Sequence, residues 1–188
     1  MSAASQGLIE KVAAKLGQPP AYAEAGDSSI LTVAAASYGS RPMEEEITQP
    51  TGFDPQVAAL FEAVVESAYL VAHADGEFDE TEQAAFKQVV LIACRNRVEA
   101  RQVDALLADL ADQLEEDGID KRVKMVARAI QKEDHAREVL RVACLLAHVS
   151  GGVSEAEQGV LQKLTSEFGL DEAALQLALG EAERALAE

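Results

Sequence analysis

The sequence predicts an all-α protein, and three features of its 188 residues carry that prediction. Hydrophobic residues make up 48% of the chain, yet only 4% of it is aromatic and tryptophan is absent. A core rich in Ala and Leu favours helices, because these are strong helix formers, whereas strands prefer β-branched and aromatic residues. Apolar residues also recur at spacings of three and four, which is helical periodicity. The breaks between such stretches are short.

Residues 1–52 differ from the rest and are predicted to form an N-terminal extension and linker with one or two short helices. Residues 8–16 carry one apolar helical stripe that stops at a glycine. A second apolar run covers residues 30–36. Residues 37–55 hold three of the five prolines and have the composition of a linker. We expect a partly flexible segment or, alternatively, a docking segment in which residues 30–33 anchor another protein.

Residues 53–188 are predicted to form one helical domain. Asp54 followed by Pro55 is a helix start, a capping residue before proline at the first helical position. Six further helices are expected near residues 79–95, 98–117, 119–131, 134–149, 154–168 and 171–187. Short turns between consecutive helices make neighbours antiparallel, so the prediction is a seven-helix bundle.

The domain contains an internal repeat. An offset of 75 residues aligns residues 69–86 with residues 144–161, with seven identities in 18 positions. The identical pairs include His73 with His148, Gly76 with Gly151, and Glu82 with Glu157. We therefore predict two pseudo-symmetric halves, each with an acidic helix-turn-helix.

The turn of the first half carries carboxylates that could bind a metal ion. Asp75, Glu77 and Asp79 occupy alternate positions, as the first three ligands of a calcium-binding EF-hand loop do. Glu82, in the first turn of the next helix, can reach back and close a smaller loop. An all-oxygen site suits a hard cation, Ca²⁺ or Mg²⁺ ahead of Zn²⁺.

The same turn also fits a structural role. The EF-hand pattern fails where Glu80 replaces the glycine of the sixth place and Phe86 replaces the glutamate of the twelfth. Capping boxes explain several of the acidic residues. The two boxes are Asp79 with Glu82 and Ser154 with Glu157.

Helix ends account for the repeated glycines and histidines as well. Gly76 and Gly151 would end helices in the left-handed conformation, and protonated His73 and His148 would favour the negative end of a helix dipole. The first two acidic residues of the turn stay unexplained, because negative charge at a helix C-terminus is unfavourable. They keep the metal hypothesis open.

The segment 71–82, with an Asp-Gly turn and a glutamate seven places after the Asp, resembles the signature of TerB-like domains. Such domains occur in tellurite-resistance proteins and in membrane-anchored DnaJ-type co-chaperones. The resemblance covers residues 53–188 and implies a seven-helix fold with acidic patches that bind metal ions. It also implies a role in bacterial stress or metal-ion response without catalysis. By the family pattern, Asp75 and Glu82 carry over as acidic site residues in the first half, and Glu157 in the second.

The second turn departs from this pattern. Ser150, Gly152 and Ser154 stand where the first turn has carboxylates, whereas Glu155 and Glu157 remain. Any cation bound at the second turn should therefore bind more weakly than at the first.

The charge and the hydropathy of the chain limit the kinds of partner and the compartment that we expect. A net charge of −17 repels phosphate backbones, which argues against nucleic-acid binding and favours divalent cations or basic protein surfaces. The N-terminus lacks the features of a signal peptide, and no apolar run approaches the roughly 18 residues that cross a bilayer. Cys94 and Cys144 lie in apolar helical patterns and outside any CxxC motif, which predicts buried, reduced thiols. These features predict a cytoplasmic protein, with any membrane association indirect and through a partner.

The function expected from the sequence is non-enzymatic. No Ser, Cys or Lys has a base at a recognisable spacing, and no glycine-rich phosphate loop is present. The first hypothesis is a protein of the tellurite-type stress response that binds a divalent cation. The alternative is a helical adaptor that holds a protein partner through its acidic surface or through residues 1–50.

Overall fold

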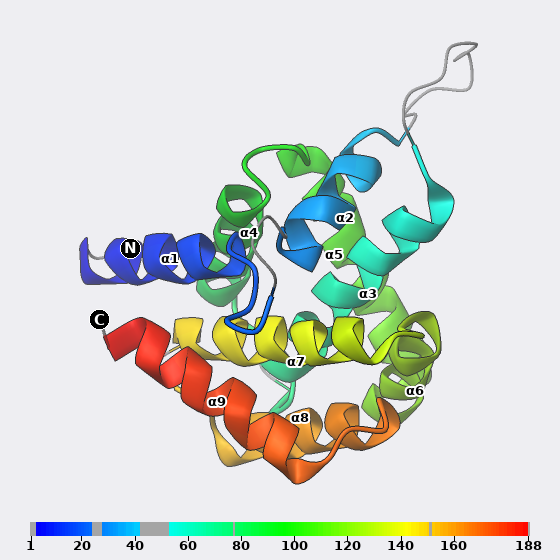
Figure 1. The fold of residues 1–188 in the computed structure, drawn as a ribbon. Helices are drawn as coiled ribbons and strands as arrows, with labels where there is room; N and C mark the ends of the chain where they lie inside the picture. Colours follow the sequence, from blue (N-terminus) through cyan, green and yellow to red (C-terminus); the bar gives the residue numbers. More distant parts are fainter. Residues whose placement is uncertain (1–2, 24–27, 42–52, 77, 151, 188) are drawn as a thin grey trace.

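A computed structural model describes residues 3–23, 28–41, 53–76, 78–150 and 152–187. Helices and connecting turns account for all of these residues, and no strand occurs among them. The α-helices are α1 (Ala3–Leu16), α2 (Ile30–Gly39), α3 (Pro55–Ala72), α4 (Glu80–Ala93), α5 (Ala100–Asp117), α6 (Ile119–Ala129), α7 (Glu133–Ala147), α8 (Glu155–Glu167) and α9 (Glu172–Ala187). A short 3-10 helix, η1 (His148–Ser150), follows α7. Figure 1 shows their arrangement.

Helices α3 and α7 are the central pair. They pack directly on each other, and most residues of both helices are buried. In Figure 1, α7 runs across the middle, with α1, α2 and α4 on one side and α8 and α9 on the other. The start of α3 is the predicted one, because Asp54 Oδ1 accepts hydrogen bonds from the backbone N–H groups of Gln56 (2.9 Å) and Val57 (3.3 Å), with Pro55 at the first helical position.

The expectation that no apolar run is long enough to cross a bilayer is wrong for helix α3. Among the described residues it is the one helix long and apolar enough to cross a membrane, with 18 residues and a mean hydropathy of 1.2. That window is 61% buried inside the protein, as the core helix of a globular fold would be.

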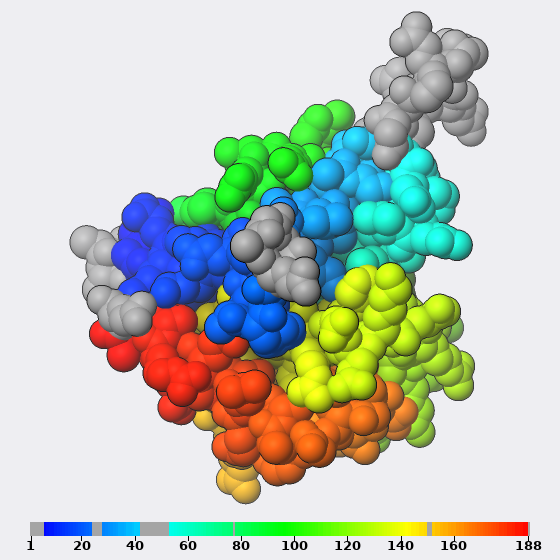
Figure 2. Space-filling model, viewed as in Figure 1, coloured from blue at the N-terminus to red at the C-terminus, as the bar shows by residue number. Residues whose placement is uncertain are grey.

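Helices α1 and α2 also belong to the core, which corrects the expectation of a partly flexible extension for the residues they contain. Val12, Leu16, Leu31 and Ala34 are fully buried. Helix α1 packs on α4 and α9, and α2 packs on α3. Figure 2 shows α1 beside α9 at one side of the molecule. The apolar stripes were visible in the sequence, but the distant helices that cover them were not. The domain boundary at residue 53 stays a prediction.

The all-helical class is confirmed for the described part of the chain. From Pro55 onward the helices start and end within a few residues of the expected positions. The fold nevertheless has nine α-helices in the described segments rather than a bundle of seven with an extension, because α1 and α2 share the same core. The division into two pseudo-symmetric halves remains a prediction.

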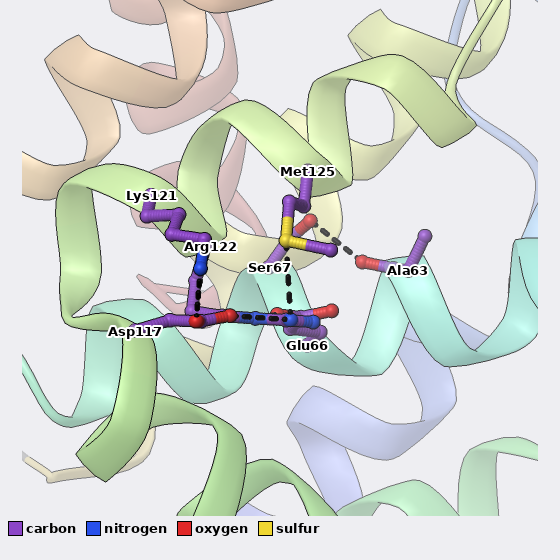
Figure 3. A network of polar contacts seen from close by, with 7 residues as sticks. All are labelled: Ala63, Glu66, Ser67, Asp117, Lys121, Arg122 and Met125. Atoms are coloured by element: carbon purple, nitrogen blue, oxygen red, sulfur yellow. Dashed lines mark hydrogen bonds and ion pairs between the residues drawn. The ribbon is translucent and has the colours of Figure 1, made fainter.

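A buried ion pair joins α3 to α6. Arg122 Nε donates to Glu66 Oε1 at 2.6 Å, and each side chain is only 9% exposed. The same guanidinium donates to Asp117 Oδ2 at 3.2 Å and to the sulfur of Met125 at 3.4 Å (Figure 3). Hydrogen bonds from Lys121 and Arg122 hold the pKa of Asp117 below its ordinary value. The network gives the buried carboxylate of α3 a partner from a neighbouring helix.

Two buried charges on α7 hold the N-terminal helices in place. Glu138 Oε1 accepts a hydrogen bond of 2.6 Å from the backbone N–H of Ile30, so it caps α2 across a separation of 108 residues. Arg141 Nη2 donates to the carbonyl of Lys15 at the end of α1 (2.9 Å), and its Nε donates to Glu181 of α9 (2.7 Å). These contacts connect α1, α2 and α9 through one face of α7.

We predict that Arg122→Met lowers the free energy of unfolding by about 3–5 kcal/mol, because it leaves the Glu66 carboxylate buried without its partner. The double variant Glu66→Met/Arg122→Met should lose much less, because no buried charge remains. Urea denaturation measures both. As a control, Arg101→Met removes a pair with Glu99 whose side chains are 64% and 61% exposed, so it should change stability by only about 0.2–1 kcal/mol. A double variant as unstable as Arg122→Met would contradict this account.

Candidate functional site

The first acidic turn joins α3 to α4. Helix α3 ends at Ala72, and the chain then turns with hydrogen bonds from Ala74 N to Val71 O (3.1 Å) and from Gly76 N to His73 O (3.0 Å). Gly76 has a φ of +84°, so the predicted left-handed glycine is confirmed, although it lies within the turn rather than at the helix end.

The start of α4 confirms the first capping box. Asp79 Oδ1 accepts from the N–H groups of Thr81 (2.7 Å) and Glu82 (2.9 Å), and Glu82 Oε2 accepts from Asp79 N (3.1 Å). Two of the predicted metal ligands, Asp79 and Glu82, therefore already accept hydrogen bonds from backbone N–H groups of this capping box. Asp75 is exposed, and Glu77 lies outside the described residues.

His73 connects this turn to an aromatic cluster. Its ring centroid lies 4.7 Å from that of Tyr69 and 5.1 Å from that of Phe78. The Nδ1 atom is buried and has no hydrogen-bond partner within the part of the chain that the structure describes. Burial lowers the pKa of His73, while the carboxylates of Asp75 and Glu82 act in the opposite direction. Burial therefore disfavours the protonated form of His73, the form that would interact favourably with the helix dipole.

The second turn is built differently. His148 Nδ1 donates to the carbonyl of Cys144 at 2.7 Å, so this histidine contacts the C-terminal end of α7 directly. Ser154 and Glu157 form the predicted capping box, with Ser154 N donating to Glu157 Oε2 at 2.7 Å. Glu157 is buried, and none of the contacts described for it reaches the first turn. Gly151 lies outside the described residues.

The side chains of the first turn have the donor chemistry of a cation site, but they do not form a complete coordination shell. Within the described residues, no three His, Cys, Asp or Glu side chains are grouped so that they could hold a metal ion. Asp75, Asp79 and Glu82 nevertheless supply carboxylate oxygens at one turn, and an ionised carboxylate offers about four lone-pair sites. Capping through one oxygen is therefore compatible with coordination through the other.

A groove beside this turn was missed by sequence reasoning. It has a volume of about 420 Å³ and lies between α4 and α5, with Tyr69 of α3 at its base; we name it the α4–α5 groove. Its apolar lining consists of Tyr69, Phe78, Ala84, Leu107, Ala108 and Ala111. Its polar lining consists of Glu80, Gln83, Lys87 and Asp104. The helical spacing of these positions was visible in the sequence, but alanines among charged residues do not indicate a surface.

Both cysteines are confirmed as buried and free of disulfides. Burial raises the pKa of Cys94 and of Cys144 to about 12. Thiolate is the reactive form of cysteine, so burial in the core disfavours reaction at both side chains.

We predict that His73 makes the protein less stable as the pH falls below its ordinary pKa of 6.5. Because folding lowers this pKa, the unfolded chain binds a proton first and stability falls with decreasing pH, by at most about 1.4 kcal/mol per pH unit. The slope of unfolding free energy between pH 7 and pH 5 should be smaller in His73→Gln.

The control for this slope is His135, whose pKa is also lowered by burial. His135→Gln should retain the contribution of His73, and the two changes together should reduce the slope further. An unchanged slope in His73→Gln would contradict a buried, neutral ring.

Comparison with known proteins identifies the family. A family model described as "Tellurite resistance protein TerB" matches residues 61–179. Searches of curated proteins and of solved structures return no match. The matched span begins in α3 and ends in α9, so it includes both acidic turns and the α4–α5 groove, while α1 and α2 lie outside it. Because this match covers more than half of the 188 residues, the chain belongs to the TerB family of tellurite resistance proteins.

Proposed function

We propose that this protein is a non-enzymatic, cytoplasmic member of the TerB family that binds a divalent cation at the first acidic turn, as part of a bacterial stress or metal-ion response. The observation that carries the proposal is that Asp75, Asp79 and Glu82 lie on one short turn, although no three such side chains among the described residues are grouped around one point. Glu82 is hydrogen-bonded to the backbone of Asp79, and Asp75 and Glu82 act on the same imidazole of His73.

The chemistry favours Ca²⁺ or Mg²⁺ over Zn²⁺. Hard cations take oxygen ligands, and Ca²⁺ in particular tolerates irregular geometry and retained water. In this proposal Asp75, Asp79 and Glu82 supply oxygens, and Glu77 is a further candidate ligand. Glu157 would serve only a second and weaker site, because it is buried in its own capping box and Ser150, Gly152 and Ser154 stand where the first turn has carboxylates.

The absence of catalysis is also part of the proposal. Membership of the TerB family supports it, and so do the raised pKa values of the two cysteines, which remove thiolate chemistry at neutral pH. His73 lies among aromatic rings, and its Nδ1 atom has no hydrogen-bond partner among the residues that the structure describes.

A second candidate function is that of an adaptor, and the exposed acidic surface of α5 supports it. Asp104, Asp112 and Glu115 are exposed on this helix. The alternative anchor at residues 30–33 has less support, because Ile30 and Leu31 are buried in the protein's own core.

Cation binding predicts stabilisation of the full chain by Ca²⁺ or Mg²⁺. A ligand at 100 times its dissociation constant stabilises the native state by about 2.7 kcal/mol, which raises the melting temperature by roughly 2–4 °C per kcal/mol for a chain of this size. The variant Asp75→Asn/Asp79→Asn/Glu82→Gln should lose this shift. Asn and Gln can still cap α4, so the variant should keep its fold without cation.

The matched control removes the same number of carboxylates from α5, in Asp112→Asn/Glu115→Gln/Glu116→Gln. All three of these residues are exposed, so the control should keep the cation-dependent shift. No shift in the wild-type chain, or an equal loss in both variants, would refute a site at the first turn.

A further inference from the structure

The α4–α5 groove has a lining suited to receive a third helix. The positions that face it are 80, 83, 84 and 87 on α4 and 104, 107, 108 and 111 on α5. Both sets follow the spacing of one helix face. These two helix faces lie side by side and form the walls of the α4–α5 groove.

Small residues make the groove accessible. Ala84, Ala108 and Ala111 line it and are exposed, so another backbone can approach closely. The apolar base is provided by Tyr69, Phe78 and Leu107. Phe78 is fixed by an edge-to-face contact with Phe86, at 5.9 Å between ring centroids. The base is therefore apolar, as is usual for a pocket that receives aliphatic side chains.

The charge around the groove is acidic. Glu80 and Asp104 line it, and its one basic lining residue, Lys87, is paired with Asp104. Along α5 the exposed acidic residues continue away from the groove, and the single basic residue of that helix, Arg101, pairs with Glu99. A partner that fits this surface carries positive charge beside its apolar face.

We infer that the α4–α5 groove docks an amphipathic helical segment of a partner protein, with aliphatic side chains on one face and Lys or Arg along its edges. This is helix-in-groove recognition. The inference rests on the adaptor candidate and is independent of cation binding, because no carboxylate proposed as a cation ligand lines the groove.

The test uses the full chain, a chelator to remove divalent cations, and a fluorescent synthetic helical peptide with Leu on one face and Lys on the other. Fluorescence polarisation should show binding, and amide chemical shifts should change along residues 80–87 and 104–111. Ala108→Arg places a charged side chain in the groove and should weaken binding by roughly tenfold or more.

The matched control is Ala105→Arg, which adds the same charge to an exposed position of α5 outside the groove. It should change the affinity by less than about twofold, since exposed charges contribute little. A peptide of the same composition without the amphipathic pattern should bind much more weakly. Equal weakening by the two substitutions, equal binding of the two peptides, or no binding to the wild-type chain would overturn the inference.

Discussion

Three buried charges on the two central helices constrain the rest of the structure. A buried charge must be paired or hydrogen-bonded, because an uncompensated one is costly. Glu66 of α3 is satisfied by Arg122 of α6, whereas Glu138 and Arg141 of α7 are satisfied by the ends of α2 and α1 and by Glu181 of α9. Each pairing sets the position of a different outer helix. The contacts of α7 explain why residues before the family match lie in the same core as residues within it.

The sequence predicts what depends on neighbours along the chain. The start of α3 at Asp54 and both capping boxes were predicted correctly, because these signals act within one helical turn. The packing of α1 and α2 was not predicted, since an apolar stripe does not say which distant helix will cover it. The cap that Glu138 gives to α2 was missed for the same reason. The state of His73 depends on burial beside Tyr69 and Phe78, which only the fold creates.

The first acidic turn and the α4–α5 groove are adjacent, because two residues that line the groove also contact His73 of the turn. Tyr69 and Phe78 line the groove, and both contact the ring of His73. The carboxylates of Asp75 and Glu82 act to raise the pKa of this ring, against the effect of burial. The helix caps hold Asp79 and Glu82 at the turn, so local structure places acidic groups where a cation could use them. The proposed cation site and the proposed docking groove therefore lie on neighbouring surfaces and use different carboxylates.

We infer that the buried charges on α7 make α1 and α2 part of one cooperative unit with the family domain. Native-state hydrogen exchange of the full chain tests it directly, because exchange reports the free energy of each opening. The buried amides of Val12 in α1 and of Ala34 and Ala35 in α2 should exchange only through openings close in free energy to global unfolding, as those of α3 and α7 do. Rapid exchange of α1 and α2 while α3 and α7 stay protected would contradict the account and restore the picture of a separate extension.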